Sequence, residues 1–169
     1  MNIDDCKNKE IILSEEKIKK IKNFSVEAAP YHYNKNNKRT SQEIEHNIYT
    51  GKMGEEVWRE AHYFLNLSPI SYEIHKDGKG DGGIDIFIGE KYGVDIKTVD
   101  STNKTYRYIG STTANFYGFV QLNASLNGGI CVGTIEHNDL IKYAEYDKEI
   151  EKNYVHKRVF EGLNSTITF

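Results

Sequence analysis

The sequence has little cysteine, no long apolar run and no excess of positive charge. Two of its 169 residues are cysteines, and they follow no disulfide or metal-ligand spacing, which excludes a disulfide-stapled domain and a zinc finger. No apolar run approaches the roughly 18 residues of a membrane helix, so we expect no membrane segment. The N-terminus lacks a basic segment followed by an apolar one. A secretory signal is therefore not expected, and we expect a cytoplasmic, intracellular location.

The net charge of the chain is slightly negative. A formal charge of −3 argues against a protein that coats nucleic acid non-specifically. It does not exclude a nuclease, because acidic metal ligands lower the total charge and a bound cation restores positive charge locally. With 38% hydrophobic and 28% charged residues and no internal repeat, the composition predicts one globular domain with a sizeable core.

The stretch Gly80 to Val99, GDGGIDIFIGEKYGVDIKTV, predicts a β-hairpin. Isoleucines alternate with other residues from Ile84 to Ile88, and a similar alternation runs from Val94 to Lys97, which is the period of half-buried strands. The polar segment Gly89 to Lys91 between them has the length of a hairpin turn. We therefore expect two strands joined by a tight turn.

The length of that turn decides which side chains face each other. A three-residue turn pairs Ile88 with Tyr92 and places Asp85 directly opposite Asp95. A two-residue turn shifts the register by one and places Asp85 opposite Val94 instead. The first register brings two carboxylates together, and the second separates them.

The expected site combines two carboxylates with an ammonium group. Residues two apart on a strand share a face, so Asp95 and Lys97 point together, and the odd-length turn adds Asp85. Converging carboxylates repel each other, and a hard divalent cation such as Mg²⁺ offsets this repulsion through oxygen ligands. The simpler alternative is a solvated sheet face on which Lys97 pairs with Asp95, which is the commoner arrangement for an arbitrary pattern of this kind.

The ordered set of motifs resembles the PD-(D/E)XK nuclease superfamily. Gly54-Glu55 lies on an expected helix, Asp85 ends the GDGGID stretch, and Asp95-Ile96-Lys97 occupies the next strand. The GDGGID and VDIK motifs are similar to those of the Mrr-like restriction-endonuclease branch. The resemblance covers residues 51–136, with two departures from the pattern: Ile84 replaces the proline, and the middle acid is an aspartate.

The resemblance implies a restriction-endonuclease-like α/β fold, an αβββαβ core with a mixed central sheet flanked by helices. It implies a metal-dependent endonuclease that hydrolyses DNA phosphodiester bonds. Asp85, Asp95 and the main-chain carbonyl of Ile96 would hold Mg²⁺, for which Mn²⁺ would substitute. Glu55 would bind through water or hold a second ion, and Lys97 would orient the attacking water.

Two adjacent glutamates compete for the helical position of this motif. Carboxylates are favoured near a helix N-terminus for electrostatic reasons alone, so neither Glu55 nor Glu56 is a ligand by its position. Their side chains differ by about 100° around the helix, so one of them faces the hairpin. The match to the GE pattern selects Glu55, with Glu56 as the alternative.

The glycine-rich segment 76–83 fits two other motifs poorly. As a calcium loop it has Lys79 in place of a ligand and Ile88 in place of the bidentate glutamate. As a phosphate loop it lacks the GK[ST] ending and leads into a strand. We interpret it as a tight turn at the site, and we prefer Asp85 to Asp81 on strand phase and on the family position.

The remaining elements follow from periodicity, caps and turns. Expected helices cover 14–24 with Ser14 as its cap, a segment from 40 with Ser41 as its cap, 52–67, 112–126 and 139–146; expected strands cover 70–75, 106–109 and 129–135, with a terminal hairpin of 155–160 and 165–169. We divide the chain into an N-terminal helical and linker extension, 1–45, a nuclease core, 46–140, and a C-terminal extension of the same domain, 141–169.

Basic residues in the expected loops are candidate contacts to nucleic-acid phosphates. They are Lys79 in the glycine-rich segment, Lys104 and Arg107 after the hairpin, and Lys38 and Arg39 in a polar linker. The alternative is that these are ordinary solvated loops.

Three functions stay open at this point. The first is a restriction or phage-defence endonuclease, and the second is a Holliday-junction resolvase or DNA-repair nuclease, which a symmetric dimer with junction spacing would distinguish. The third is a non-catalytic nucleic-acid-binding protein on the same fold, against which the intact Asp85, Asp95 and Lys97 argue. We expect DNA as the partner and a homodimer as the assembly.

Overall fold

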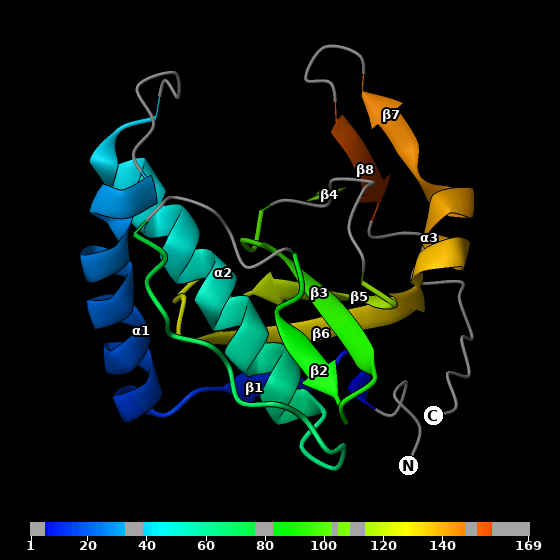
Figure 1. The fold of residues 1–169 in the computed structure, drawn as a ribbon, viewed down its shortest axis with the longest axis horizontal. Coiled ribbons are helices and arrows are strands. Elements are labelled where there is room, and N and C mark those ends of the chain that lie inside the picture. Colours follow the sequence, from blue (N-terminus) through cyan, green and yellow to red (C-terminus); the bar gives the residue numbers. More distant parts are fainter. Residues whose placement is uncertain are drawn as a thin grey trace.

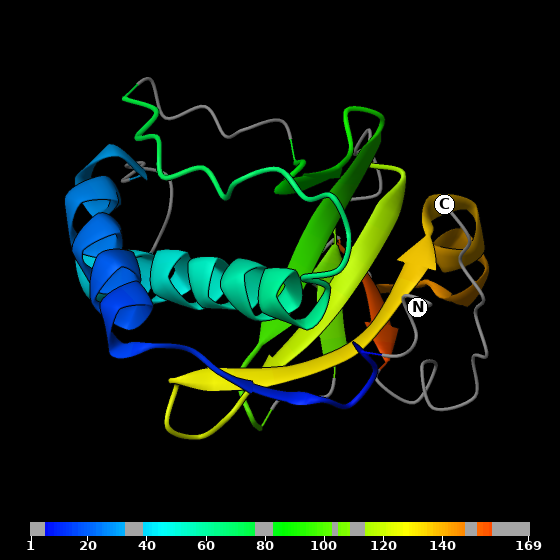
Figure 2. The same cartoon turned by 90° about the horizontal axis from the view of Figure 1, so that it is seen from below.

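A computed structural model describes residues 6–32, 39–76, 83–102, 105–108, 114–147 and 152–156. Helices α1 and α2 lie on one side of a central sheet, and a smaller sheet with α3 lies on the other side (Figures 1 and 2). The elements in chain order are β1 (Glu10–Ile12), α1 (Glu15–Ala28), the 3-10 helix η2 (Ala29–His32), α2 (Ser41–Ala61), β2 (Ile86–Ile88), β3 (Tyr92–Val99), β4 (Thr105–Tyr108), β5 (Phe116–Leu122), β6 (Gly128–Glu136), α3 (His137–Tyr143), β7 (Glu145–Asp147) and β8 (Lys152–His156).

The central sheet has five strands in the order β1-β6-β5-β3-β2. β3 and β5 run parallel, and the other neighbouring pairs are antiparallel. The mixed sheet that the sequence predicts is therefore confirmed. A second, antiparallel sheet has the order β4-β8-β7. Because β1 pairs with β6, and α2 runs unbroken through residues 45 and 46, the N-terminal residues share the core of the rest of the chain.

The two faces of the central sheet belong to two different apolar clusters. On the first face, Val57 and Trp58 of α2 pack against Ile96 of β3 and its neighbours. On the second face, Tyr117 and Phe119 of β5 pack against β4, β8 and α3. This division fixes which residues of β3 point towards α2 and which point away.

Two helix starts are set by local hydrogen bonds. Ser14 is the N-cap of α1, as predicted, and its hydroxyl accepts from the Lys17 N–H. The cap of α2 is Thr40 and not Ser41, because Thr40 and Glu43 form a reciprocal capping box. The prediction of Ser41 as the cap was wrong by one residue.

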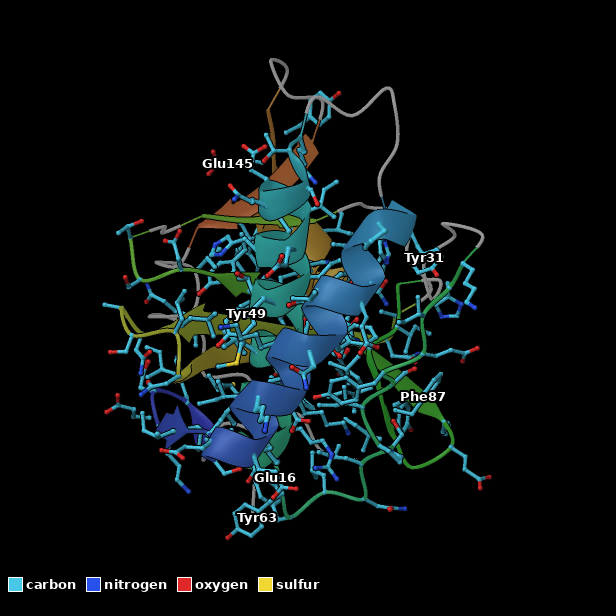
Figure 3. All side chains as sticks on the ribbon, turned by 90° about the vertical axis from the view of Figure 1, so that its left-hand side faces the viewer. Glu16, Tyr31, Tyr49, Tyr63, Phe87 and Glu145 are labelled. Atoms are coloured by element: carbon cyan, nitrogen blue, oxygen red, sulfur yellow. The ribbon has the colours of Figure 1, made fainter. Side chains whose placement is uncertain are left out.

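Helix α2 is one continuous helix that ends at Ala61, so the predicted end near Leu67 was wrong. Phe64 and Leu65 still pack against the core, but they do so from the irregular segment after the helix. Tyr49 reaches from α2 towards the β5–β6 turn, where its hydroxyl donates to the Leu126 carbonyl at 2.9 Å (Figure 3). The apolar periodicity continued beyond the helix because Phe64 and Leu65 are partly buried against the core.

The predicted strand over 70–75 does not form. The outer edge of β2 is occupied by residues 66–68 instead: Leu67 bridges Ile88, and the Ser68 N–H donates to the Phe87 carbonyl at 2.9 Å. Ile70 and Tyr72 pack against the core from an irregular segment. Their alternation reflects contact with the helices and not pairing in a sheet.

The predicted helix over 112–126 is also wrong, since this stretch contains strand β5. Its residues Phe116 to Val120 are all buried, because α2 covers one face and the small sheet and α3 cover the other. A strand buried on both faces is a continuous apolar run, which periodicity does not separate from a buried helix. The predicted αβββαβ order is therefore wrong at two elements: the strand over 70–75 does not form, and the helix over 112–126 is replaced by strand β5.

The C-terminal predictions are met in part. β6 confirms the strand over 129–135, and β4 lies one residue from the predicted strand over 106–109. α3 ends at Tyr143, three residues before the predicted end, because β7 begins at Glu145. β8 overlaps the start of the predicted terminal hairpin, and residues 157–169 lie outside the described part of the chain. Among the helices of the described ranges, none is long and apolar enough to cross a membrane.

Candidate active site

The β2–β3 hairpin has the three-residue turn that the sequence predicts. Ile88 pairs with Tyr92 and Ile86 pairs with Val94, so the turn has three residues. Gly89 in this turn has a φ of 60°, a left-handed conformation that favours glycine. The three-residue turn is therefore confirmed. The pairing ends at Ile86 and Val94, so the ladder does not extend to Asp85 and Asp95.

Asp85 is bound to β3 by its main chain and by its side chain. Its N–H donates to the Val94 carbonyl at 2.9 Å, and its Oδ2 accepts from the Ile96 N–H at 2.6 Å. The paired part of β2 begins only at Ile86, so the carboxylate takes the place of a main-chain acceptor at this edge. The N–H and C=O of one strand residue point to the same side, so the Ile96 carbonyl also faces the edge that Asp85 occupies.

Asp95 forms a buried ion pair with Lys97. Asp95 Oδ1 lies 2.6 Å from Lys97 Nζ, and the two side chains are 3% and 22% exposed. Their register partners on β5, Tyr117 and Phe119, belong to the cluster on the face away from α2. Asp95 and Lys97 therefore point to that second face, and Lys97 is the more exposed member of the pair.

Asp85 and Asp95 thus both adjoin the peptide unit between Asp95 and Ile96. Asp85 contacts the N–H of Ile96, and Asp95 is the residue that precedes this N–H. The arrangement supplies carboxylate and carbonyl oxygens, the ligands that Mg²⁺ prefers. Lys97 adds an ammonium beside the Asp95 carboxylate.

Glu55 lies on the opposite side of β3 from Asp95 and Lys97. Helix α2 packs on the first face, and the residue before Glu55, Gly54, abuts Thr98 there. The Glu55 carboxylate is buried, and its Oε2 lies 2.7 Å from Lys52 Nζ. Across the described residues, no group of three or more His, Cys, Asp or Glu side chains is arranged to hold a metal ion. The ligand role of Glu55 therefore stays a prediction.

Glu56 has a different set of partners. Its Oε2 lies 3.0 Å from Lys17 Nζ on α1, and its Oε1 accepts from the Tyr72 hydroxyl at 2.9 Å. Burial raises the pKa of the Tyr72 hydroxyl, and the nearby Glu56 carboxylate raises it further. Glu56 therefore ties α1, α2 and the segment around Tyr72 together, which gives it a structural reason to be a buried carboxylate.

Lys17 balances the carboxylates on this side of α2. Its ammonium contacts both Glu56 and Glu60. Burial alone would lower the pKa of Lys17, but its hydrogen bonds to Glu60 and Glu56 outweigh this effect and raise it. The lysine therefore stays charged over the whole ordinary pH range.

Most of the predicted contacts to nucleic acid lie beyond what the structure describes. Lys38, Lys79 and Lys104 are outside the described residues, as is Asp81. Arg107 is on β4, and its side chain is not described, whereas Arg39 is exposed immediately before α2. The phosphate-binding role of these residues stays a prediction.

Sequence reasoning missed one feature of this site. Gly93 is the second residue of β3, and its missing side chain makes room for Ile84, the residue before Asp85. A glycine inside a strand pattern is a signal of close approach, and it was available in the YGVDIK stretch.

No protein-family model matches the chain, and no curated protein matches it either. The nuclease resemblance therefore rests on the motif residues and their geometry.

Proposed function

We propose that this protein is a metal-dependent endonuclease that hydrolyses DNA phosphodiester bonds, on a variant of the restriction-endonuclease-like fold. The observation that supports it best is the bond from the Ile96 N–H to the Asp85 carboxylate. This bond brings Asp85 to the peptide that follows Asp95, and Asp95 in turn is paired with the ammonium of Lys97. The mixed sheet with a helix across one face is compatible with the same fold.

Asp85, Asp95 and the Ile96 carbonyl would hold Mg²⁺ or Mn²⁺. When bound, the ion would lower the pKa of a water molecule and neutralise charge that develops on the phosphate. Lys97 would orient the attacking water and stabilise the phosphate oxygens, since its side chain is partly exposed while its partner is buried. Glu55 would need to release Lys52 before it could bind the ion through water.

A site with two carboxylates is sufficient for Mg²⁺ under one condition. Mg²⁺ keeps several waters and is commonly held by one or two carboxylates together with substrate phosphates. We therefore infer that the DNA phosphate completes the site, so that metal binding is weak without DNA and stronger with it. Isothermal titration of Mn²⁺ in the presence and absence of a short non-cleavable duplex measures this difference.

The test of the function is cleavage of supercoiled plasmid, linear duplex and branched DNA with Mg²⁺, with Mn²⁺ or with EDTA. The proposal predicts cutting with either metal and none with EDTA. Preference for branched DNA by a dimer would favour a Holliday-junction resolvase or repair nuclease over a restriction or phage-defence enzyme. Metal-independent binding of DNA, with no cutting of any substrate, would favour the non-catalytic alternative and contradict the proposal.

A further inference from the structure

Ile84 fills a notch on β3 that exists because residue 93 is glycine. A Cβ atom built on Gly93 would lie 2.8 Å from Ile84 Cδ1, 3.1 Å from Cγ2 and 3.2 Å from Cγ1. The first of these distances is shorter than real Cβ contacts allow, and the other two are tighter than nearly all of them. A methyl group at residue 93 would therefore displace Ile84 from its present place.

The notch itself is held rigidly from the other side of β3. The Asn115 N–H donates to the Gly93 carbonyl at 2.9 Å, and the Gly93 N–H donates to Asn115 Oδ1 at 2.8 Å. These two bonds tie the start of β3 to the start of β5. A conflict at residue 93 would therefore be relieved by movement of Ile84 and not by movement of β3.

Ile84 is in turn the anchor from which Asp85 projects. Gly83 has a φ of 80°, so the chain turns sharply just before Ile84, and Ile84 packs against the apolar cluster on the second face. Asp85 precedes the paired part of β2, so the ladder does not set its direction. Its place is set by Ile84 on one side and by its bonds to Val94 and Ile96 on the other.

We propose that Gly93 and Ile84 are positioning residues for Asp85: their contact places the Asp85 carboxylate on the Ile96 N–H, beside Asp95. The part of this inference that concerns metal binding rests on the proposed function. The part that concerns the position of Asp85 does not, and the two parts can be tested separately.

The position of Asp85 is read from the main-chain amide of Ile96 by ¹H–¹⁵N nuclear magnetic resonance. A short bond to a carboxylate shifts this amide proton downfield and slows its exchange with solvent. In Gly93→Ala we expect the proton to move upfield and its exchange to accelerate about tenfold, as expected when one charge-assisted hydrogen bond is lost. Adding Ile84→Val, which removes the Cδ1 atom nearest the new methyl group, should restore both values.

Two further variants keep this test decisive. Gly51→Ala places a methyl group in open space on α2 and should leave the Ile96 amide unchanged. Ile84→Ala removes the contact without adding bulk, and it should shift the Ile96 amide even if Gly93→Ala fails to fold. An Ile96 amide that is unchanged in folded Gly93→Ala, or in Ile84→Ala, would overturn the inference.

The metal arm is a titration of Mn²⁺ with the same variants in the presence of a non-cleavable duplex. Loss of positioning around a metal ligand typically weakens metal binding about 10- to 100-fold, so we expect that loss in Gly93→Ala and recovery with Ile84→Val. If the Ile96 amide responds and the Mn²⁺ affinity does not, the positioning role stands and the metal-site proposal fails. If the Ile96 amide shift and exchange do not change, the positioning role fails, whether or not the Mn²⁺ affinity changes.

Discussion

Gly54 on α2 lies directly against the side chain of Thr98 on β3: a Cβ atom added to the glycine would lie 1.8 Å from Thr98 Oγ1. This contact lets α2 approach the strand that carries Asp95 and Lys97. It gives a packing reason for the glycine of the GE pair, independent of any catalytic role of the glutamate that follows it.

Gly54→Ala should therefore destabilise the protein by about 1–3 kcal/mol, the usual cost of overpacking a well-packed contact. Gly51→Ala, one turn earlier on the same helix, meets open space and should stabilise the protein by about 0.5–1 kcal/mol through helix propensity. Urea unfolding of both variants measures the difference. Equal stability of the two variants would mean that α2 does not approach β3 this closely.

Trp58 joins α2 to strand β6 through its indole N–H, which donates to Thr134 Oγ1 at 3.0 Å. Trp58→Phe should cost about 1–3 kcal/mol, because a hydrogen bond is lost and a large buried side chain shrinks. Thr134→Val removes the other partner. The loss of unfolding free energy in the double variant should be smaller than the sum of the two single losses, because each single variant already removes the same hydrogen bond. Strictly additive losses would contradict this contact.

Lys97→Met keeps the aliphatic stem of the lysine but removes the partner of buried Asp95. Breaking a fully buried pair costs about 3–5 kcal/mol; because Lys97 is partly exposed, we expect about 2 kcal/mol. Lys142→Met breaks the exposed pair with Asp139, 2.5 Å long, and should cost less than about 0.5 kcal/mol. Thermal unfolding of the two variants provides the comparison. A Lys97→Met variant as stable as the wild type would argue against a buried pair.

The stability of the protein should fall at alkaline pH in part through Tyr72. Burial and the Glu56 carboxylate raise the pKa of Tyr72 above its ordinary value of 10.0. The folded protein then holds the Tyr72 proton to higher pH than the unfolded chain does. This contribution is complete below pH 10 and is lost as the pH rises towards the folded value.

Tyr72→Phe has no such proton, so its stability should decline less above pH 10 than that of the wild type. Near pH 8 the variant should be less stable by about 1–2 kcal/mol, because the hydrogen bond to Glu56 is lost. The gap should narrow near pH 11. Tyr63→Phe is the matched control, since Tyr63 is 66% exposed (Figure 3). A gap that stays constant with pH would contradict the assigned Tyr72 environment.

The hairpin was predictable because its signals are local. The alternation of Ile86 and Ile88 and the three residues before Tyr92 fixed the register of the paired strands. Ile84 lies on the other face, and the Asp85 carboxylate is placed by its bond to the Ile96 N–H and not by the ladder. The ion pair of Asp95 with Lys97 follows from the same alternation. Sequence patterns describe such short-range relations well, because strand period and turn length act on neighbouring residues.

The errors arose where tertiary contacts decide. β5 is buried on both faces, so its sequence carries no alternation that separates it from a buried helix. The segment around Ile70 and Tyr72 alternates because it packs on helices, and α2 ends before its apolar pattern does. Within the site, the contact between Ile84 and Gly93 depends on the fold of the hairpin, and no spacing rule reveals it.

Asp85 has two roles that one substitution can separate. The side-chain carbonyl of Asp85→Asn can still accept from the Ile96 N–H, whereas Asp85→Ala cannot. Asp85→Asn should therefore keep nearly full stability and lose metal binding, while Asp85→Ala should lose both, with a stability cost of about 1–3 kcal/mol. Urea unfolding and Mn²⁺ titration check the two effects. A variant Asp85→Asn that binds metal as the wild type does would remove Asp85 from the ligand set.

Cleavage of supercoiled plasmid by wild type, Asp95→Asn and Asp139→Asn at one Mg²⁺ concentration shows directly whether Asp95 belongs to a metal-dependent nuclease site. Asp139→Asn also removes an aspartate from a lysine pair, but on the exposed surface of α3. The account predicts that wild type and Asp139→Asn cut equally and that folded Asp95→Asn cuts at least about 100-fold more slowly, the scale expected when a metal ligand is lost. Equal cutting by all three proteins would contradict it.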